Sequence, residues 1–130
     1  MDDSRIITVE KPLLRDAAEE MREKVLDLCN NGWKLQGGAS VTEKDYKNLH
    51  WCEIYQKIVK GNQKLIDYGI LETSGFGESA DSLEQRNMLE LQRFHDNGWK
   101  IQGGVSVTKN VINESDGPCY TIYHTMIKEE

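Results

Sequence analysis

Hydrophobic and polar residues alternate along residues 33–42, a pattern typical of a strand that buries one of its faces. Residues 14–30 place apolar side chains at intervals of three and four, which predicts an amphipathic helix before that strand. A β-branched run at 6–9 and a longer apolar segment at 49–60 predict one further strand on each side of this pair. The first half of the chain therefore predicts the order strand, helix, strand, strand, and we expect the last two strands to form an antiparallel hairpin.

The same order of elements is predicted again in the second half. A strand at 65–73 precedes a helix that begins at Asp81, three residues before Glu84, as in a capping box. Strands at 99–108 and 119–128 follow, joined by a loop that is rich in turn residues. We therefore predict the α+β fold class: two βαββ repeats with antiparallel sheets, related by a pseudo-twofold axis.

The two predicted repeats span residues 1–61 and 62–130. Each repeat has roughly 60 residues, which is too few to bury a large core alone. We therefore expect the halves to pack together as one compact unit, with each helix on its own sheet. Apolar residues on both faces of the last strand of each repeat also predict self-association into a homo-oligomer.

The strongest sign of duplication is a twelve-residue stretch, residues 31–42, that recurs 66 residues later. Ten of its twelve positions are identical, and the other two exchange one apolar residue for another. Residues 13–30 and 79–96 share no identical position at the same offset, so the helices have diverged far more than this strand. Its polar face is unchanged in both copies, and ten residues form that face: Lys34, Gln36, Gly38, Ser40, Thr42, Lys100, Gln102, Gly104, Ser106 and Thr108.

Two explanations fit an unchanged polar face. In the first, the face is buried where one half, or one subunit, packs on another, because small residues let sheets approach closely. In the second, it binds a ligand: Gln, Ser and Thr offer directional hydrogen bonds, Lys offers positive charge, and Gly exposes the backbone. We predict that these ten residues are ligand-binding, and the packing explanation stays open.

The repeated strand and the strand after it carry a family-like pattern: Gly32-Trp33, Gly37-Gly38, Ser40-Val41, Tyr55 and Gln56. This pattern resembles a small bacterial and phage domain family that is described only as a domain of unknown function. The second copy fits it as well, with His124 in the place of Gln56, so the resemblance covers nearly the whole chain as a tandem pair. Tyr55 and Gln56 are adjacent here, whereas the family separates its tyrosine and glutamine by one residue. The resemblance implies the βαββ order and brings no established activity.

Composition narrows the possible partners. A net charge of −6 argues against a general nucleic-acid binder or a protein that binds anionic membranes. No apolar run approaches the roughly 20 residues of a membrane span, and the first residues do not form a secretory signal. Three cysteines without a C-x-x-C spacing indicate reduced thiols. We therefore expect a cytoplasmic location, which is the host cytoplasm if a phage encodes the chain.

Catalytic patterns are missing from the sequence. His50, His95 and His124 have no partner that is repeated in the other copy, and none has the spacing of a Cys/His metal site. The chain contains no phosphate-binding loop and no nucleophile elbow. We therefore predict that the protein is not an enzyme and has neither a cofactor nor a metal.

A soluble chain with a duplicated polar face and no catalytic motif is expected to be a non-catalytic binding protein. We predict that it captures and sequesters a small ligand. Because the resemblance includes phage proteins, the most concrete version is a nucleotide-type immune signal that a phage removes from its host's defence. The alternative is a protein–protein adaptor or structural homo-oligomer that uses the same strand face.

Overall fold

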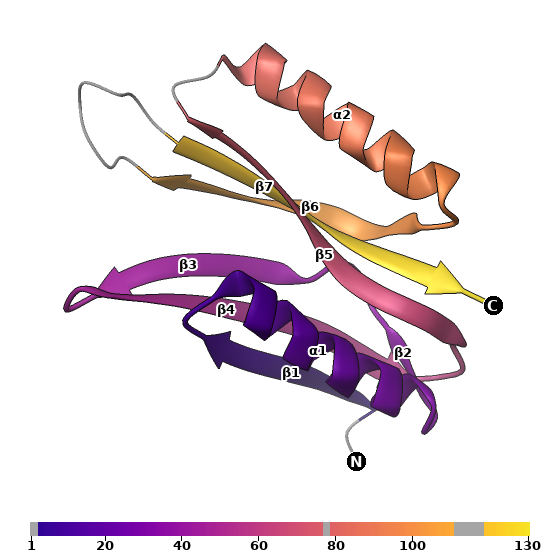
Figure 1. The fold of residues 1–130 in the computed structure, drawn as a ribbon. Coiled ribbons are helices and arrows are strands. Elements are labelled where there is room, and N and C mark those ends of the chain that lie inside the picture. The colour runs from indigo at the N-terminus through magenta and orange to yellow at the C-terminus, as the bar shows by residue number, and fades with distance from the viewer. Residues whose placement is uncertain (1–2, 77–78, 111–118) are drawn as a thin grey trace.

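The computed structural model describes residues 3–76, 79–110 and 119–130. These residues form two helices and seven strands in two antiparallel sheets, so the predicted α+β class is confirmed. The order along the chain (Figure 1) is β1 (Ser4–Lys11), α1 (Leu14–Cys29), β2 (Trp33–Leu35), β3 (Ser40–Tyr46), β4 (Leu49–Lys60), β5 (Leu65–Phe76), α2 (Ala80–Asp96), β6 (Lys100–Asn110) and β7 (Cys119–Glu129).

Each half of the chain forms one sheet. The N-terminal sheet has the order β1-β4-β2, with β3 also paired to β4, and the C-terminal sheet has the order β5-β7-β6. The last strand of each half is therefore central. The pairing register also corresponds, because Ser40 lies opposite Tyr55 in the N-terminal sheet and Ser106 lies opposite Tyr123 in the C-terminal sheet.

The single strand predicted at 33–42 is two strands, β2 and β3, because the chain turns between them. Gly37 lies in this turn with φ of 71°, a conformation that favours glycine. The buried Gln56 side chain supports the turn by donating from Nε2 to the Gly37 carbonyl at 3.2 Å. Its Oε1 accepts a hydrogen bond from the Tyr68 hydroxyl at 3.0 Å, which links the turn to the C-terminal sheet.

The predicted helices are confirmed, with one correction at the start of α2. The N-cap is Ser79, whose hydroxyl accepts a hydrogen bond from the Ser82 N–H at 3.2 Å, so the predicted Asp81–Glu84 box does not cap the helix. β5 is also longer than predicted and extends to Phe76. The predicted turn at 111–118 lies outside the described residues.

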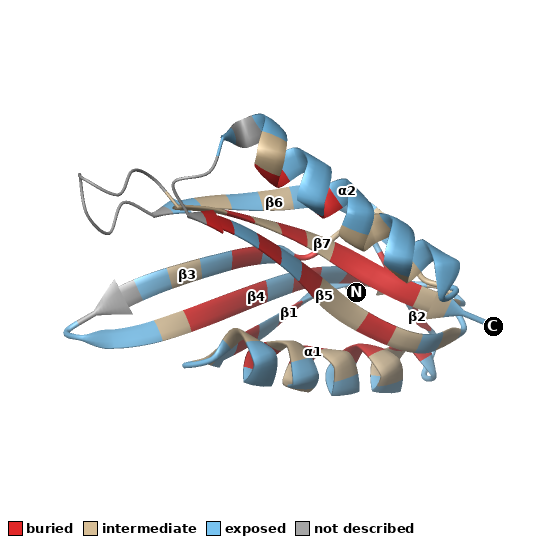
Figure 2. Cartoon of the chain, turned by 45° about the horizontal axis from the view of Figure 1, so that its top comes forward, coloured by how far each residue is buried: buried red, intermediate tan, exposed pale blue. Residues whose placement is uncertain are grey.

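One hydrophobic core lies between the two sheets and α1. Buried residues follow β4, β5 and β7 and the inner side of α1 (Figure 2). The helix contacts β1 and β4 of its own sheet, as predicted, and it also contacts β5 of the other sheet. Both halves contribute to this core, whose members include Ile7, Val9, Met21, Val25, Trp33, Val41, Ile54, Ile58, Tyr68, Tyr123 and Ile127.

The outer side of the C-terminal sheet is only partly covered. α2 lies across β5, where Leu83 and Asn87 are buried, and it leaves β6 largely open (Figure 1). Ile101, Val105 and Val107 of β6 are 46%, 54% and 56% exposed. The repeated stretch predicts a strand that buries its apolar face, and that prediction is wrong for β6 because α2 does not extend over it. Neither of the two described helices is long and apolar enough to cross a membrane.

Candidate functional site

The two copies of the repeated strand meet where β3 lies beside β6. β3 is an edge strand, so its outward backbone groups need partners other than a neighbouring strand. The Thr125 hydroxyl accepts a hydrogen bond from the Ala39 N–H at 2.7 Å. The Ser106 hydroxyl lies 3.3 Å from both the N–H and the carbonyl oxygen of Val41. Side chains of the C-terminal sheet therefore form hydrogen bonds with backbone groups at the edge of the N-terminal sheet.

Glycines allow this close approach. A Cβ atom on Gly38 would lie 2.7 Å from the Gln102 carbonyl oxygen, and a Cβ atom on Gly103 would lie 2.0 Å from the Gly38 nitrogen. Both distances are shorter than real Cβ contacts, so any side chain at either position would push the strands apart. Gln102 also donates from Nε2 to the Gly37 carbonyl oxygen at 3.3 Å. These contacts form what we call the strand junction.

In the second copy, the fold itself uses much of the predicted site. Gln102 and Ser106 bond across the strand junction, and Thr108 has a buried hydroxyl without a partner among the described residues. Lys100 is exposed and pairs with Glu129, with 2.5 Å between Nζ and Oε1. The packing explanation therefore accounts for the retention of Gln102 and Ser106 in the second copy. Gly104 lies beside them and is exposed.

In the first copy, the same side chains point away from the core. Lys34, Gln36, Ser40 and Thr42 are all exposed, and their side chains form no hydrogen bond or ion pair with any described residue. They lie on the side of the N-terminal sheet that faces away from the core, which we call the outer face. Cross-strand neighbours complete this outer face: Ile6, Thr8, Tyr55, Lys57 and Val59. The structure thus divides the predicted residues. Gly38, Gln102 and Ser106 form a junction set, whereas the first-copy residues Lys34, Gln36, Ser40 and Thr42 form an exposed set.

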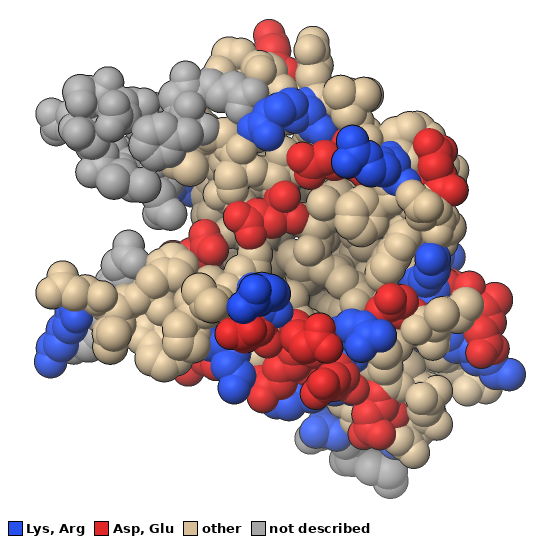
Figure 3. All heavy atoms as spheres, in the orientation of Figure 1, with Lys and Arg blue, Asp and Glu red and all other residues tan. Residues whose placement is uncertain are grey.

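A small hollow lies at the strand junction. Its volume is about 260 Å³, and it is lined by the same three positions of each copy: Gly38, Ala39, Ser40, Gly104, Val105 and Ser106. A larger hollow of about 360 Å³ lies between α1 and β5. There Arg22 of α1 pairs with Asp67 of β5, with 2.5 Å between Nε and Oδ1. Figure 3 shows mixed charges over this side of the molecule, with acidic side chains gathered over α1.

Polar side chains on the outer face hold one another in place. Glu53 is only 8% exposed because Lys44 and Tyr55 cover it, and the Tyr55 hydroxyl donates to Glu53 Oε2 at 2.6 Å. Hydrogen bonds from Lys44 and Tyr55 lower the pKa of Glu53 to about 2. The hydrogen bond to Glu53 also raises the pKa of Glu10 from its ordinary value. The Tyr55 ring is therefore anchored beside Ser40 with a fixed carboxylate at its edge.

A second group of polar side chains lies on the opposite side of the same hairpin, and the sequence did not reveal it. Glu43 on β3 lies directly opposite Cys52 on β4, and His50 precedes Cys52 by two residues, so all three side chains share one face. Burial, followed by the nearby Glu43 carboxylate, raises the pKa of the Cys52 thiol to about 12. The available signal was a His-x-Cys pair on a strand opposite a glutamate. Spacing along the chain does not show that these residues meet, because only strand pairing brings Glu43 beside Cys52.

The chain was also compared with known proteins. No family model, curated protein or solved structure matches it.

Proposed function

We propose that this protein is a non-catalytic binding protein that captures a small ligand on the outer face of its N-terminal sheet. The observation that carries the proposal is the exposure of Lys34, Gln36 and Ser40, which are identical to their counterparts in the second copy. Their counterparts Gln102 and Ser106 are retained by contacts within the fold. The side chains of Gln36 and Ser40 form no hydrogen bond with the described residues, so in this proposal a ligand supplies the missing constraint.

The chemistry of the outer face fits a nucleotide-type ligand. Lys34 and Lys57 offer positive charge to a phosphate, even though the whole chain carries a net charge of −6. Hydroxyls of Ser40 and Thr42 offer hydrogen bonds, and the anchored Tyr55 ring offers a surface for stacking a base. Sequestration of a nucleotide-type immune signal, as a phage anti-defence protein would perform it, is the version of this proposal that we favour.

The proposal also covers the arrangement of the two repeats and the location of the protein in the cell. We propose that residues 1–61 and 62–130 are two βαββ units related by a pseudo-twofold axis, which the matched strand order and register support. A cytoplasmic location is also part of the proposal, since Cys29, Cys52 and Cys119 form no disulfide. No bound cofactor is needed for capture without chemistry.

The test uses calorimetry and thermal shift against a panel of mononucleotides, dinucleotides and cyclic nucleotides. A ligand that binds the folded chain raises its melting temperature. Ser40→Ala should weaken binding about tenfold or more because one hydrogen bond to the ligand is lost. The matched control is Ser106→Ala, which should lower the melting temperature and keep the affinity. If no nucleotide produces heat or a shift, the nucleotide assignment is wrong.

A second candidate, a structural homo-oligomer, is favoured by one specific observation. Val105 and Val107 are 54% and 56% exposed, whereas their counterparts Ala39 and Val41 are 7% and 1% exposed. β6 is also an edge strand of its own sheet. A second chain that covers this face of β6 would bury Val105 and Val107. Their counterparts Ala39 and Val41 are already buried in the core of the same chain. The mass of the protein in solution distinguishes this candidate from a monomeric ligand binder.

A further inference from the structure

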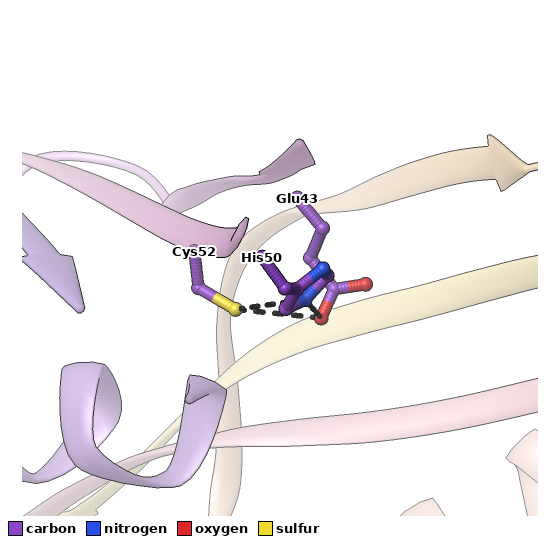
Figure 4. Close-up of side chains that lie close together, drawn as sticks. All are labelled: Glu43, His50 and Cys52. Carbon is purple, nitrogen blue, oxygen red and sulfur yellow. Dashed lines mark hydrogen bonds and ion pairs between the residues drawn. The ribbon is translucent and has the colours of Figure 1, made fainter. Parts of the chain in front are cut away.

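Three potential metal ligands meet near the end of the β3–β4 hairpin (Figure 4). The Cys52 sulfur lies 3.5 Å from Glu43 Oε1 and 3.6 Å from His50 Nε2. The third side of this triangle, from His50 Nε2 to Glu43 Oε1, is 3.7 Å. That last distance is longer than a hydrogen bond, the two groups form an ion pair when His50 is protonated, and all three ligand atoms converge on a common point.

The size of this triangle matches a tetrahedral zinc site. Zinc binds sulfur at about 2.3 Å, histidine nitrogen at about 2.0–2.1 Å and carboxylate oxygen at about 2.0–2.2 Å. At tetrahedral angles those bond lengths place sulfur about 3.5–3.7 Å from nitrogen or oxygen, and nitrogen about 3.3–3.5 Å from oxygen. The two separations from sulfur, 3.5 and 3.6 Å, lie within their range, and the nitrogen–oxygen separation of 3.7 Å is slightly longer than its range. An ion at the centre would require little movement of the protein.

The three side chains also differ in exposure in a way that suits metal entry. Cys52 is fully buried, the Glu43 side chain is 14% exposed and the His50 side chain is 45% exposed. Two ligands therefore come from the interior and one comes from the surface, which leaves a path for the ion. Three protein ligands leave the fourth tetrahedral position open to water or to a ligand atom.

A buried hydroxyl near this cluster lacks a partner. Tyr123 of β7 is 1% exposed, and its hydroxyl has no hydrogen-bond partner among the described residues. Burial raises the pKa of Tyr123, the nearby Thr108 hydroxyl lowers it, and the nearby Glu43 carboxylate raises it again. A metal-bound water or the second carboxylate oxygen of Glu43 would give this hydroxyl a partner, as is common around metal ligands.

We propose that Glu43, His50 and Cys52 form a zinc site with an open fourth position. A thiolate with an imidazole suits zinc, whereas magnesium and calcium prefer oxygen ligands alone. Binding replaces the proton of the Cys52 thiol with the metal, so one proton is released to solvent and no electron is transferred. The corresponding positions of the second copy, Lys109 and Tyr120, carry no such ligands, so we expect one ion per chain.

The test is a titration of the purified full chain with Zn²⁺ and, as a spectroscopic probe, with Co²⁺. We expect one equivalent to bind, a thiolate-to-cobalt charge-transfer band, and a higher melting temperature with zinc. His50→Gln should weaken zinc binding by about 100-fold or more while the chain stays folded, because His50 lies at the surface. Cys52→Ser should abolish the charge-transfer band.

Matched controls use a histidine and a cysteine outside the cluster. His95→Gln and Cys119→Ser should bind both metals as the wild-type chain does. A charge-transfer band that survives in Cys52→Ser, undiminished affinity in His50→Gln, or a preference for Mg²⁺ would each overturn the proposal. Ser40→Ala should keep zinc binding. The zinc proposal and the nucleotide proposal are therefore tested separately, and either can be wrong while the other holds.

Discussion

The Ser106 hydroxyl lies 3.3 Å from both the N–H and the carbonyl oxygen of Val41, and it serves one as acceptor and the other as donor. One serine side chain thus takes the place of a neighbouring strand at the edge of β3. This contact explains why Ser106 is retained in the second copy. It leaves Ser40, the identical residue of the first copy, without a role in the fold.

Replacing Ser106 with alanine should therefore destabilise the protein. The change removes both partners of Val41 in a partly buried setting, which costs about 1–3 kcal/mol in the free energy of unfolding. Ser40→Ala should alter that free energy by less than about 0.5 kcal/mol, as exposed substitutions do. Urea denaturation of both variants measures the difference. Equal effects of the two substitutions would contradict the asymmetric junction.

Gly103 should tolerate no side chain. A Cβ atom there would lie 2.0 Å from the Gly38 nitrogen, and its φ of 74° is unfavourable for other residues. Gly103→Ala should cost more than about 2 kcal/mol, because both backbone strain and overpacking oppose it. The control is Gly104→Ala, since a Cβ atom at Gly104 has no atom within 4 Å. Thermal unfolding of the pair should show a large loss for the first variant and a small one for the second.

The two tryptophans of the repeated stretch, Trp33 and Trp99, should contribute unequally to stability. Trp33 is 8% exposed within the core, and Lys60 Nζ lies 4.4 Å from its ring centre. Trp33→Ala should cost about 3–5 kcal/mol, as other buried aromatic truncations do. Trp99 is half-buried and packs edge-on against Phe94, so Trp99→Ala should cost less. Chemical denaturation checks the order, and a larger loss at Trp99 would show that the core is centred elsewhere.

Acidic pH should weaken the fold through His124. Burial lowers the pKa of this imidazole from its ordinary value of 6.5, so the folded chain binds its proton less readily than the unfolded chain. The free energy of unfolding should therefore fall as the pH drops from 6.5 through the folded pKa. His124 Nε2 lies 2.9 Å from Asn87 Oδ1, while Nδ1 has no partner among the described residues.

The variant that tests this pH dependence replaces His124 with the residue found at the equivalent position of the first copy. His124→Gln introduces the residue that stands at the equivalent position, Gln56, and removes the titrating group. Stability curves of the variant and the wild-type chain should differ in slope between neutral and mildly acidic pH. Parallel curves would mean that another group sets the acid sensitivity.

The exposed valines of β6 test self-association. Val105→Lys and Val107→Lys together should reduce a homo-oligomer to a species of 14.9 kDa, because charge on an exposed edge strand opposes pairing. Leu13→Lys is a control, since Leu13 is also apolar and exposed at 53% but precedes α1. Light scattering measures the mass. A wild-type chain that is already monomeric at micromolar concentration would exclude this assembly.

Periodicity alone predicted much of this fold, because local patterns record which side of each element is buried. The helix at 14–30 and the strand at 49–60 match α1 and β4 closely. The α+β class followed from their order, and the ten unchanged polar positions were readable from the repeat itself. Side-chain periodicity is a property of neighbours along the chain, so the sequence was sufficient for these features.

Tertiary structure decided what the same residues do in each copy. Ser40 and Ser106 occupy identical sequence, yet Ser106 bonds to Val41 and Ser40 is exposed, because only one sheet presents its edge to the other. The convergence of Glu43 with Cys52 likewise depends on hairpin pairing that no linear spacing encodes. Burial and ligand geometry arise from contacts between distant segments, and one local sequence therefore has two environments.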